Sequence, residues 1–219
     1  YTTLSRFLYN FYGVYQLVGR EYPMPEHRTV PGATRVYLRI HEDRLGALIG
    51  EGGKVLKELE SRLGVKISVN SVDSSVVIEP ASSYTPATNV IKCQEIVKAI
   101  DYCFSYERAS RLYDDEAVLI VVDLKDYTGS SENHLQRVKG RIIGEEGRAR
   151  RTLEEMTDTY ISVCREYVAI IGDYSRAELA RQAIEMLAQG RQHSTVYKFL
   201  DRAIRELKRR EATDLWRRM

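Results

Sequence analysis

The sequence lacks the features of a secreted, membrane-spanning or metal-binding protein. Its only cysteines, Cys93, Cys103 and Cys164, form no CxxC pair and no Cys/His cluster. An odd, scattered number of cysteines argues against a disulfide framework and against a zinc site. No apolar run approaches the roughly 20 residues that span a bilayer, and the mixed aromatic and polar start does not resemble a signal peptide. We therefore expect a cytoplasmic protein with no membrane association, no metal and no cofactor.

The chain also has no recognisable catalytic site. Its four histidines, His27, His41, His134 and His193, lie far apart and belong to no known motif. No nucleophile stands in a recognisable pattern with a general base. The adjacent acids Glu145-Glu146 are explained more simply as acids that favour the start of a helix. The sequence predicts that the protein is not an enzyme.

Positive charge is scarce overall but concentrated at the C-terminus. The formal net charge is +2, whereas residues 191–219 hold nine Lys/Arg against four Asp/Glu and carry +5, which leaves −3 for residues 1–190. Apolar residues at helical spacing in this segment predict an amphipathic helix with its basic face outward: Val196, Leu200, Ala203, Ile204 and Leu207. That face is either a phosphate-contacting arm or a solvated surface, and the sequence leaves both readings open.

An internal repeat organises the rest of the chain. The segment GALIGEGGKVLKELESRLGVKISV (46–69) returns 94 positions later as GRIIGEEGRARRTLEEMTDTYISV (140–163). At that single offset glycines fall on glycines and apolar positions on apolar positions, and Val77 falls on Ile171. Ungapped agreement over this length indicates two copies of one structural unit.

Each copy contains the same succession of predicted elements. In the first copy these are a strand at 36–40, a helix from about Asp43 that stops at Gly50, a second helix, strands at 66–70 and 75–79, and a third helix. In the second copy they are a strand at 117–124, helices from about His134 and Arg148, strands at 160–164 and 168–172, and a helix from Ser175. Ser175 and Glu178 have the spacing of a capping box. Both copies are β-α-α-β-β-α, an α+β unit with helices on one face of a three-stranded sheet.

In both copies a Gly-x-x-Gly turn joins the first two helices: Gly50-Glu51-Gly52-Gly53 and Gly144-Glu145-Glu146-Gly147. A single such turn could be purely structural, because glycine commonly ends helices. Here the turn occurs twice, each time before an amphipathic helix and a hairpin, as in KH domains, whose GXXG loop clamps about four nucleotides of a single strand. Missing side chains let a phosphodiester approach the backbone, and the next helix offers unpaired N–H groups.

We predict that the two loops bind RNA together with nearby cations. The predicted site comprises all eight loop residues with Lys54, Lys57, Arg141, Arg148 and Arg151. Leu48, Ile49 and Ile67, with Ile142, Ile143 and Ile161, either floor the two binding grooves or belong to the core. A nucleotide P-loop is excluded because Leu48 and Val55 stand where Gly and Ser/Thr are required. A dinucleotide fingerprint fails because Val55 replaces Gly or Ala and a helix precedes it.

The second half resembles a known family. The motif GR-I-x-G-x-x-G at 140–147, followed by Gly190, Val196-Tyr197 and Leu200, is similar to the ribosome-assembly factors called partner of Nob, or Dim-two-like, proteins. The resemblance extends over most of residues 33–210. It implies an N-terminal extension (1–32), two tandem type-I KH domains (33–112 and 113–192) and a basic C-terminal helix (193–219).

The resemblance also implies a function and partners. These are rRNA processing through the 3′ region of small-subunit rRNA, the Nob endonuclease, and the alpha subunit of translation initiation factor two for archaeal relatives. Eukaryotic members lack the first GXXG loop, so the intact Gly50–Gly53 loop looks archaeal and suggests that both units contact RNA. Glu145-Glu146 departs from the basic loops that are usual in KH domains. The alternative is that the second unit docks a protein and only the first binds RNA.

Overall fold

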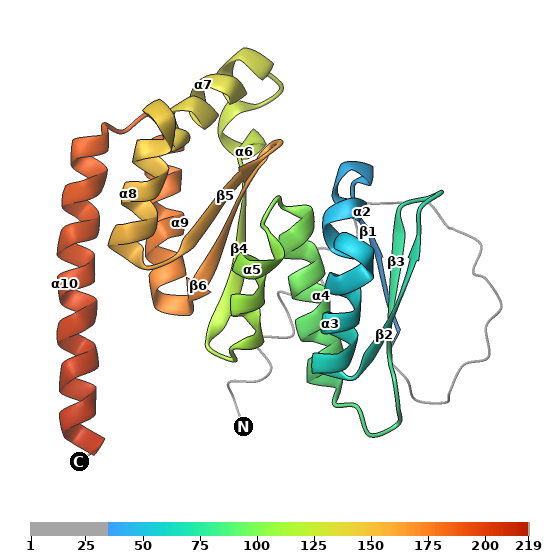
Figure 1. Cartoon of the computed structure of the whole chain (residues 1–219). Coiled ribbons are helices and arrows are strands. Elements are labelled where there is room, and N and C mark those ends of the chain that lie inside the picture. Colours follow the sequence, from blue (N-terminus) through green and yellow to red (C-terminus); the bar gives the residue numbers. More distant parts are fainter. Residues whose placement is uncertain (1–34, 219) are drawn as a thin grey trace. The chain divides into compact units, whose positions relative to one another are not determined.

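The computed structural model describes residues 35–218, of which residues 214–218 are described as helical backbone only. The expected β-α-α-β-β-α order is confirmed in the first copy (Figure 1). Its elements are β1 (Val36–Arg39), α2 (Glu42–Ile49), η1 (Glu51–Gly53), α3 (Lys54–Leu63), β2 (Val65–Asn70), β3 (Ser75–Pro80) and α4 (Ala87–Asp101). The antiparallel sheet has the order β1-β3-β2, which leaves β2 at an edge. The expected N-terminal extension lies outside the described residues.

The second copy repeats this order, with a short extra helix, α6, after its first strand and a long helix, α10, at its end. Its elements are β4 (Ala117–Asp123), α6 (Lys125–Thr128), α7 (Glu132–Ile143), η3 (Glu145–Gly147), α8 (Arg148–Thr157), β5 (Tyr160–Cys164), β6 (Tyr167–Asp173), α9 (Tyr174–Ala188) and α10 (His193–Arg218). The sheet order is β4-β6-β5, with β5 at an edge. As expected, α10 buries Val196 and Leu200 and packs along α9 and α8 (Figure 1). No helix in residues 35–218 combines the length and apolar character needed to cross a membrane.

Two predicted helix caps are wrong. Helix α2 is preceded by His41, and Asp43 lies inside its first turn, where its carboxylate binds Arg165 of the second copy. The expected capping box of α9 does not form, because the helix begins one residue earlier, after Asp173. Glu178 accepts instead from Arg181 and Gln182 on the next turn of the same helix.

The two hairpins differ in length, which changes one correspondence of the repeat. Ser68 of β2 pairs with Val77, whereas the matching Ser162 of β5 pairs with Ala169. Val77 therefore corresponds in space to Ala169 rather than to Ile171, because the second hairpin turn is two residues shorter. A shift of two residues keeps every side chain on its original face of the strand. The faces predicted from the ungapped repeat consequently stay correct.

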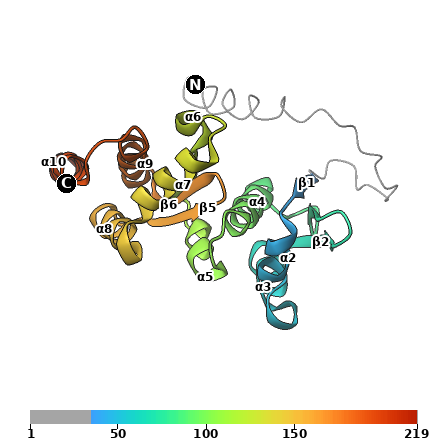
Figure 2. The same ribbon diagram turned by 90° about the horizontal axis from the view of Figure 1, so that it is seen from above.

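The two sheets differ in what covers their outer faces. In the second sheet, Val168 and Ile170 face the helices of their own unit, while Ala169 and Ile171 join the core built around α4 of the first unit. Figure 2 shows α4 between the two sheets. Strand β6 is thus buried on both faces, which explains its unbroken apolar run. In β3 full burial alternates with partial exposure. Two short segments that the sequence analysis did not predict, α5 (Tyr106–Ala109) and η2 (Ser110–Tyr113), complete this contact between the two copies, which we call the joint.

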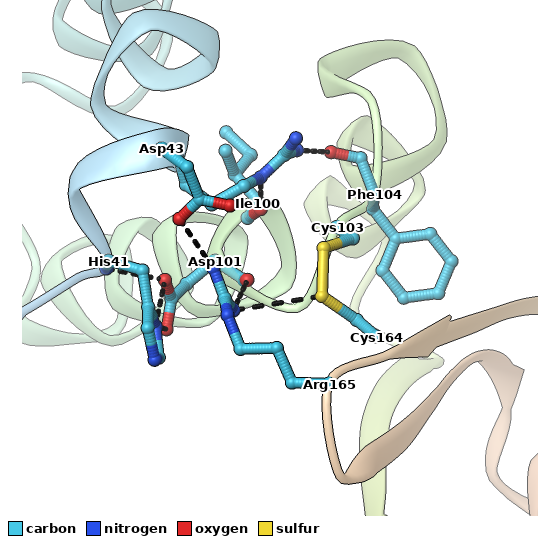
Figure 3. Close-up of polar contacts among 9 residues, drawn as sticks. His41, Asp43, Ile100, Asp101, Cys103, Phe104, Cys164 and Arg165 are labelled. Atoms are coloured by element: carbon cyan, nitrogen blue, oxygen red, sulfur yellow. Dashed lines mark hydrogen bonds and ion pairs between the residues drawn. A yellow bond between two sulfur atoms is a disulfide. The ribbon is translucent and has the colours of Figure 1, made fainter. Parts of the chain in front are cut away.

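A disulfide crosses the same joint, so the expectation of no disulfide is wrong. Cys103, just after α4, is bonded to Cys164 at the end of β5. The neighbouring Arg165 donates to the carbonyl oxygen of Asp101 (3.1 Å) and to the carboxylate of Asp43 (2.6 Å) (Figure 3). The two cysteines lie 61 residues apart in the chain. Only the packing of the second hairpin against the end of α4 brings them together, and spacing alone could not reveal it.

We expect this disulfide to stabilise the folded protein. Replacing both cysteines (Cys103→Ser with Cys164→Ser) reopens a 61-residue separation and should lower the free energy of unfolding by roughly 2–4 kcal/mol. Urea unfolding with and without dithiothreitol measures the effect. In reductant the unfolding midpoint of the native protein should fall to that of the variant, whereas the midpoint of the variant should not change.

Cys93 provides the control for this experiment. Burial raises the pKa of its thiol to about 12, so the thiol stays protonated and does not exchange. A Cys93→Ala variant should keep its response to reductant. Native protein whose unfolding midpoint is the same with and without dithiothreitol would show that the Cys103–Cys164 bond does not form.

Candidate RNA-binding loops

The two Gly-x-x-Gly turns have the same backbone geometry. Gly50 and Gly144, which follow α2 and α7, both have φ 72° and ψ 175°. Each loop then makes a single tight turn, closed by a hydrogen bond from the N–H of its last glycine to the carbonyl of its first, 3.2 Å in both copies. The repeat seen in the sequence is therefore a repeat of one loop conformation.

The first glycine of each loop is required by a close approach to the next helix. A Cβ on Gly50 would lie 2.5 Å from Cγ2 of Val55, and a Cβ on Gly144 would lie 2.6 Å from Cβ of Ala149. Both glycines also have positive φ, which L-residues with side chains rarely adopt. By contrast, a Cβ on the last glycine, Gly53 or Gly147, would meet no atom within 4 Å. The outer side of each loop is open to a ligand.

The third loop position separates the two copies. Gly52 and Glu146 have nearly the same left-handed backbone, φ 60° and φ 51°, a conformation that costs a residue with a side chain about 1–2 kcal/mol. The guanidinium of Arg151 donates to the carbonyl oxygen of Glu146 (2.9 Å) and so braces this strained turn. Arg151, predicted to contact RNA, thus has a structural contact in the loop itself.

Each loop leads into a helix whose first N–H groups have no side-chain cap. Neither α3 nor α8 receives a side-chain hydrogen bond at its N-cap or has an acid in its first turn, whereas Ser131 caps α7. Lys54 and Lys57 are exposed beside the first loop, and Arg148 beside the second. The first N–H of each helix donates to a loop carbonyl, that of Lys54 to Glu51 and that of Arg148 to Glu145. The helix start beyond it, with no side-chain cap and with adjacent cations, forms an anion-binding arrangement. Glu145 and Glu146 are exposed at the second loop, and their negative charge opposes anion binding there.

Arg141 lies at the end of α7 but points to the protein backbone. Its guanidinium donates to the carbonyl oxygens of Gly190 and Arg191, between α9 and α10. The ring of His193 in turn bonds the carbonyl oxygen of Arg141 (2.9 Å). These contacts physically join the two halves of the family motif, GR at 140–141 and Gly190 to Leu200. They hold the start of α10 beside the second loop.

Most of the apolar residues considered as groove floor belong to the core. Leu48, Ile142 and Ile161 have no exposed surface, and Ile67 is also buried. Ile49 and Ile143 are half-buried next to the loops and are the two of the six that an RNA strand on the loop could most readily touch. The basic face of α10 is partly neutralised, since Arg205 pairs with Asp201 and two further arginines pair with Glu206.

Sequence reasoning missed a pair of carboxylates that link each loop helix to its sheet edge. Oε1 of Glu60 accepts from the N–H of Ile67, and Oε1 of Glu154 from the N–H of Ile161, both at 2.8 Å. The signal was present in the repeat, because Glu60 and Glu154 are themselves 94 residues apart. Among residues 35–218, no His/Cys/Asp/Glu cluster has the form of a metal site.

Comparisons with known proteins agree with this geometry. Residues 35–97 match the family model described as KH domain, and residues 118–205 match the eukaryotic type KH-domain (KH-domain type I). The KH domain-containing protein MJ0443 of Methanocaldococcus jannaschii is 41% identical over 181 residues, 83% of this chain and 78% of that protein. The pre-rRNA-processing protein PNO1 of Coccidioides immitis is 24% identical over 186 residues, 84% of this chain and 67% of that protein.

A solved structure is similar over most of the described residues. It is a chain from the a/eIF2α–aDim2p–rRNA complex of Pyrococcus horikoshii, with a TM-score of 0.75 and 39% identity over 80% of this chain and 96% of that chain. Two KH domains in the same order, two GXXG loops of one geometry and these similarities lead to one conclusion. The chain belongs to the PNO1/Dim2 family of proteins with two KH domains.

Proposed function

We propose that the protein binds single-stranded ribosomal RNA through both GXXG loops during maturation of the small ribosomal subunit. The observation that carries the proposal is the duplicated site: each open loop leads into an uncapped helix start flanked by exposed cations. A phosphodiester fits such a site because the N–H groups and cations replace its lost hydration. The name of the PNO1 relative, a pre-rRNA-processing protein, and the rRNA in the Pyrococcus complex support this assignment.

The finer assignments are part of the same proposal. The RNA is the 3′ region of small-subunit rRNA, and the protein positions the Nob endonuclease on it; the alpha subunit of translation initiation factor two is a second partner. The family is one of RNA-binding proteins, not a known class of enzyme. A cytoplasmic location stays a prediction. The disulfide fits it in cells such as hyperthermophilic archaea, whose intracellular proteins are rich in disulfides.

The two loops are proposed to bind RNA with different strength. The first loop presents one acid, Glu51, beside Lys54 and Lys57, whereas the second presents Glu145 and Glu146 beside Arg148. Carboxylates next to the N–H groups repel a phosphate, and salt screens that repulsion. The specific observation that favours protein docking at the second unit is this acidic loop tip.

Adding a negative charge to the loops should weaken RNA binding. Gly52→Asp with Gly53→Asp, or Gly147→Asp in the second loop, places a carboxylate where the phosphate passes, in space that admits a Cβ. We expect binding of single-stranded RNA to weaken by roughly 1–3 kcal/mol per altered loop, measured by fluorescence anisotropy.

The matched controls carry asparagine at the same positions. Asn adopts the left-handed backbone about as readily as Asp and has nearly the same shape, so the paired variants differ mainly in charge. The Asn variants should bind more tightly than the Asp variants at equal folding stability. Equal affinity of native protein and both Asp variants would refute RNA binding at these loops.

Reversing the charge at the second loop should strengthen RNA binding. Glu145→Lys with Glu146→Lys should raise affinity for arbitrary single strands about tenfold at low salt, because repulsion becomes attraction, and should slightly lower the melting temperature as the favourable helix-dipole contact is lost. Anisotropy titrations at two salt concentrations and thermal unfolding measure these effects.

Glu146→Gly is the matched control, since it gives the second loop the Gly-Glu-Gly-Gly sequence of the first. It removes one charge and relieves the left-handed strain at this position, so stability should rise by about 1 kcal/mol with a smaller gain in affinity. If the Lys variant binds RNA no better but loses a Nob-type endonuclease in a pull-down, the second loop is a protein-docking surface.

A further inference from the structure

The equivalent carboxylates Glu60 and Glu154 occupy the open edge of each sheet. Strands β2 and β5 are the outermost strands of their sheets. The N–H groups of Ile67 and Ile161, which donate to these carboxylates, therefore point away from the sheet. Glu154 lies seven residues beyond Gly147 along α8, an axial rise of about 10 Å. A segment of about four nucleotides held on the loop reaches that far.

The first domain contributes a side chain to the sheet edge of the second copy, and the first copy has no equivalent contact within the described residues. Arg108, in the short helix α5 of the first domain, donates from Nη1 to Oε1 of Glu154 at 3.0 Å. Its guanidinium carbon lies 5.2 Å from the centre of the Tyr160 ring on β5. Within residues 35–218 no cation forms an ion pair with Glu60, the equivalent residue of the first copy.

The Arg108 guanidinium has donors to spare. Its side chain is 41% exposed, whereas that of Glu154 is 12% exposed, so the arginine covers the carboxylate and itself faces solvent. Nε and Nη2 make no hydrogen bond to any other residue in the described part of the chain. Guanidinium N–H groups bind carbonyl oxygens and ring nitrogens of bases. A carboxylate instead accepts from exocyclic amino groups.

We propose that Arg108 is a specificity-determining residue of the second RNA site, contributed by the first domain. The inference rests on the proposed function. It means that the first edge presents a hydrogen-bond acceptor to RNA and the second edge presents donors. Glu60 offers an acceptor at the first edge, which suits the exocyclic amino group of adenine or cytosine. Arg108 offers paired donors at the second edge, which suits guanine, whose O6 and N7 are adjacent acceptors. The two domains therefore read different bases with one loop geometry.

The test isolates the second site in the full-length chain. In a Gly52→Asp, Gly53→Asp background, affinities for two uridine heptamers, one with a central guanosine and one with a central adenosine, are compared with and without Arg108→Gln. The ratio of guanosine to adenosine affinity should fall about tenfold, as expected for loss of a bidentate contact to guanine. Arg108→Lys keeps the charge beside Glu154 but not the forked donors, so it should retain most affinity and lose most of the discrimination.

Arg111 is the matched control, because it crosses the same joint without touching Glu154. It pairs with Asp173 (3.4 Å) and Asp158 (3.7 Å), and its guanidinium carbon is 5.7 Å from the same Tyr160 ring. Arg111→Gln should leave the ratio unchanged. Thermal unfolding of each variant shows that the comparison is made on folded protein.

The outcomes separate the inference from the proposed function. A background protein that binds neither heptamer overturns RNA binding at the second domain and this inference with it. A background that binds RNA with a ratio unaffected by Arg108→Gln, or equally affected by Arg111→Gln, overturns the role of Arg108 alone. A ratio lowered by Arg108→Gln only supports it.

Discussion

The contact between the first loop glycine and the following helix is the constraint on which each domain depends. Gly50 lies so close to Val55, and Gly144 to Ala149, that neither position admits a side chain. That approach brings the end of the first helix directly against the start of the second. Beyond this contact lie the helix start without a side-chain cap and the open outer side of the loop, and the sequence adds the flanking cations. A single steric requirement thus builds the anion-binding geometry twice.

The two copies share that geometry and differ in their surroundings. The second sheet is covered on both faces because the first domain packs α4 and its following turns against it. Arg108 and Arg165 bind acids across the joint, and the Cys103–Cys164 bond closes it. At the loops, the second copy replaces Gly52 by Glu146 in a backbone that favours glycine. Its strain suggests that the acid has a function in recognition rather than in folding.

The sequence could predict the parts of this structure that are local or repeated. The glycine spacing, the amphipathic faces of α3 and α8 and the apolar run of β6 each have a period or a turn signature that a single segment displays. The loop residues, too, could be chosen because the motif occurs twice. The hairpin difference escaped detection because a two-residue shift preserves the facing of every strand residue.

Contacts between distant segments could not be predicted in this way. Asp43 is of a residue type that often caps helices, yet it binds Arg165 because the second hairpin reaches the start of α2. Arg141 is of a residue type that often binds phosphate, yet it donates a hydrogen bond to the backbone between α9 and α10. Each of these side chains has a local use and a long-range use, and only the assembled fold decides between them. Crosslinking the full-length protein to small-subunit rRNA fragments with ultraviolet light, and mapping the crosslinked peptides, tests the central claim of two RNA-binding loops most directly. The account predicts crosslinks in the peptides that contain residues 50–57 and 144–151; crosslinks confined to one of them, or to neither, would contradict it.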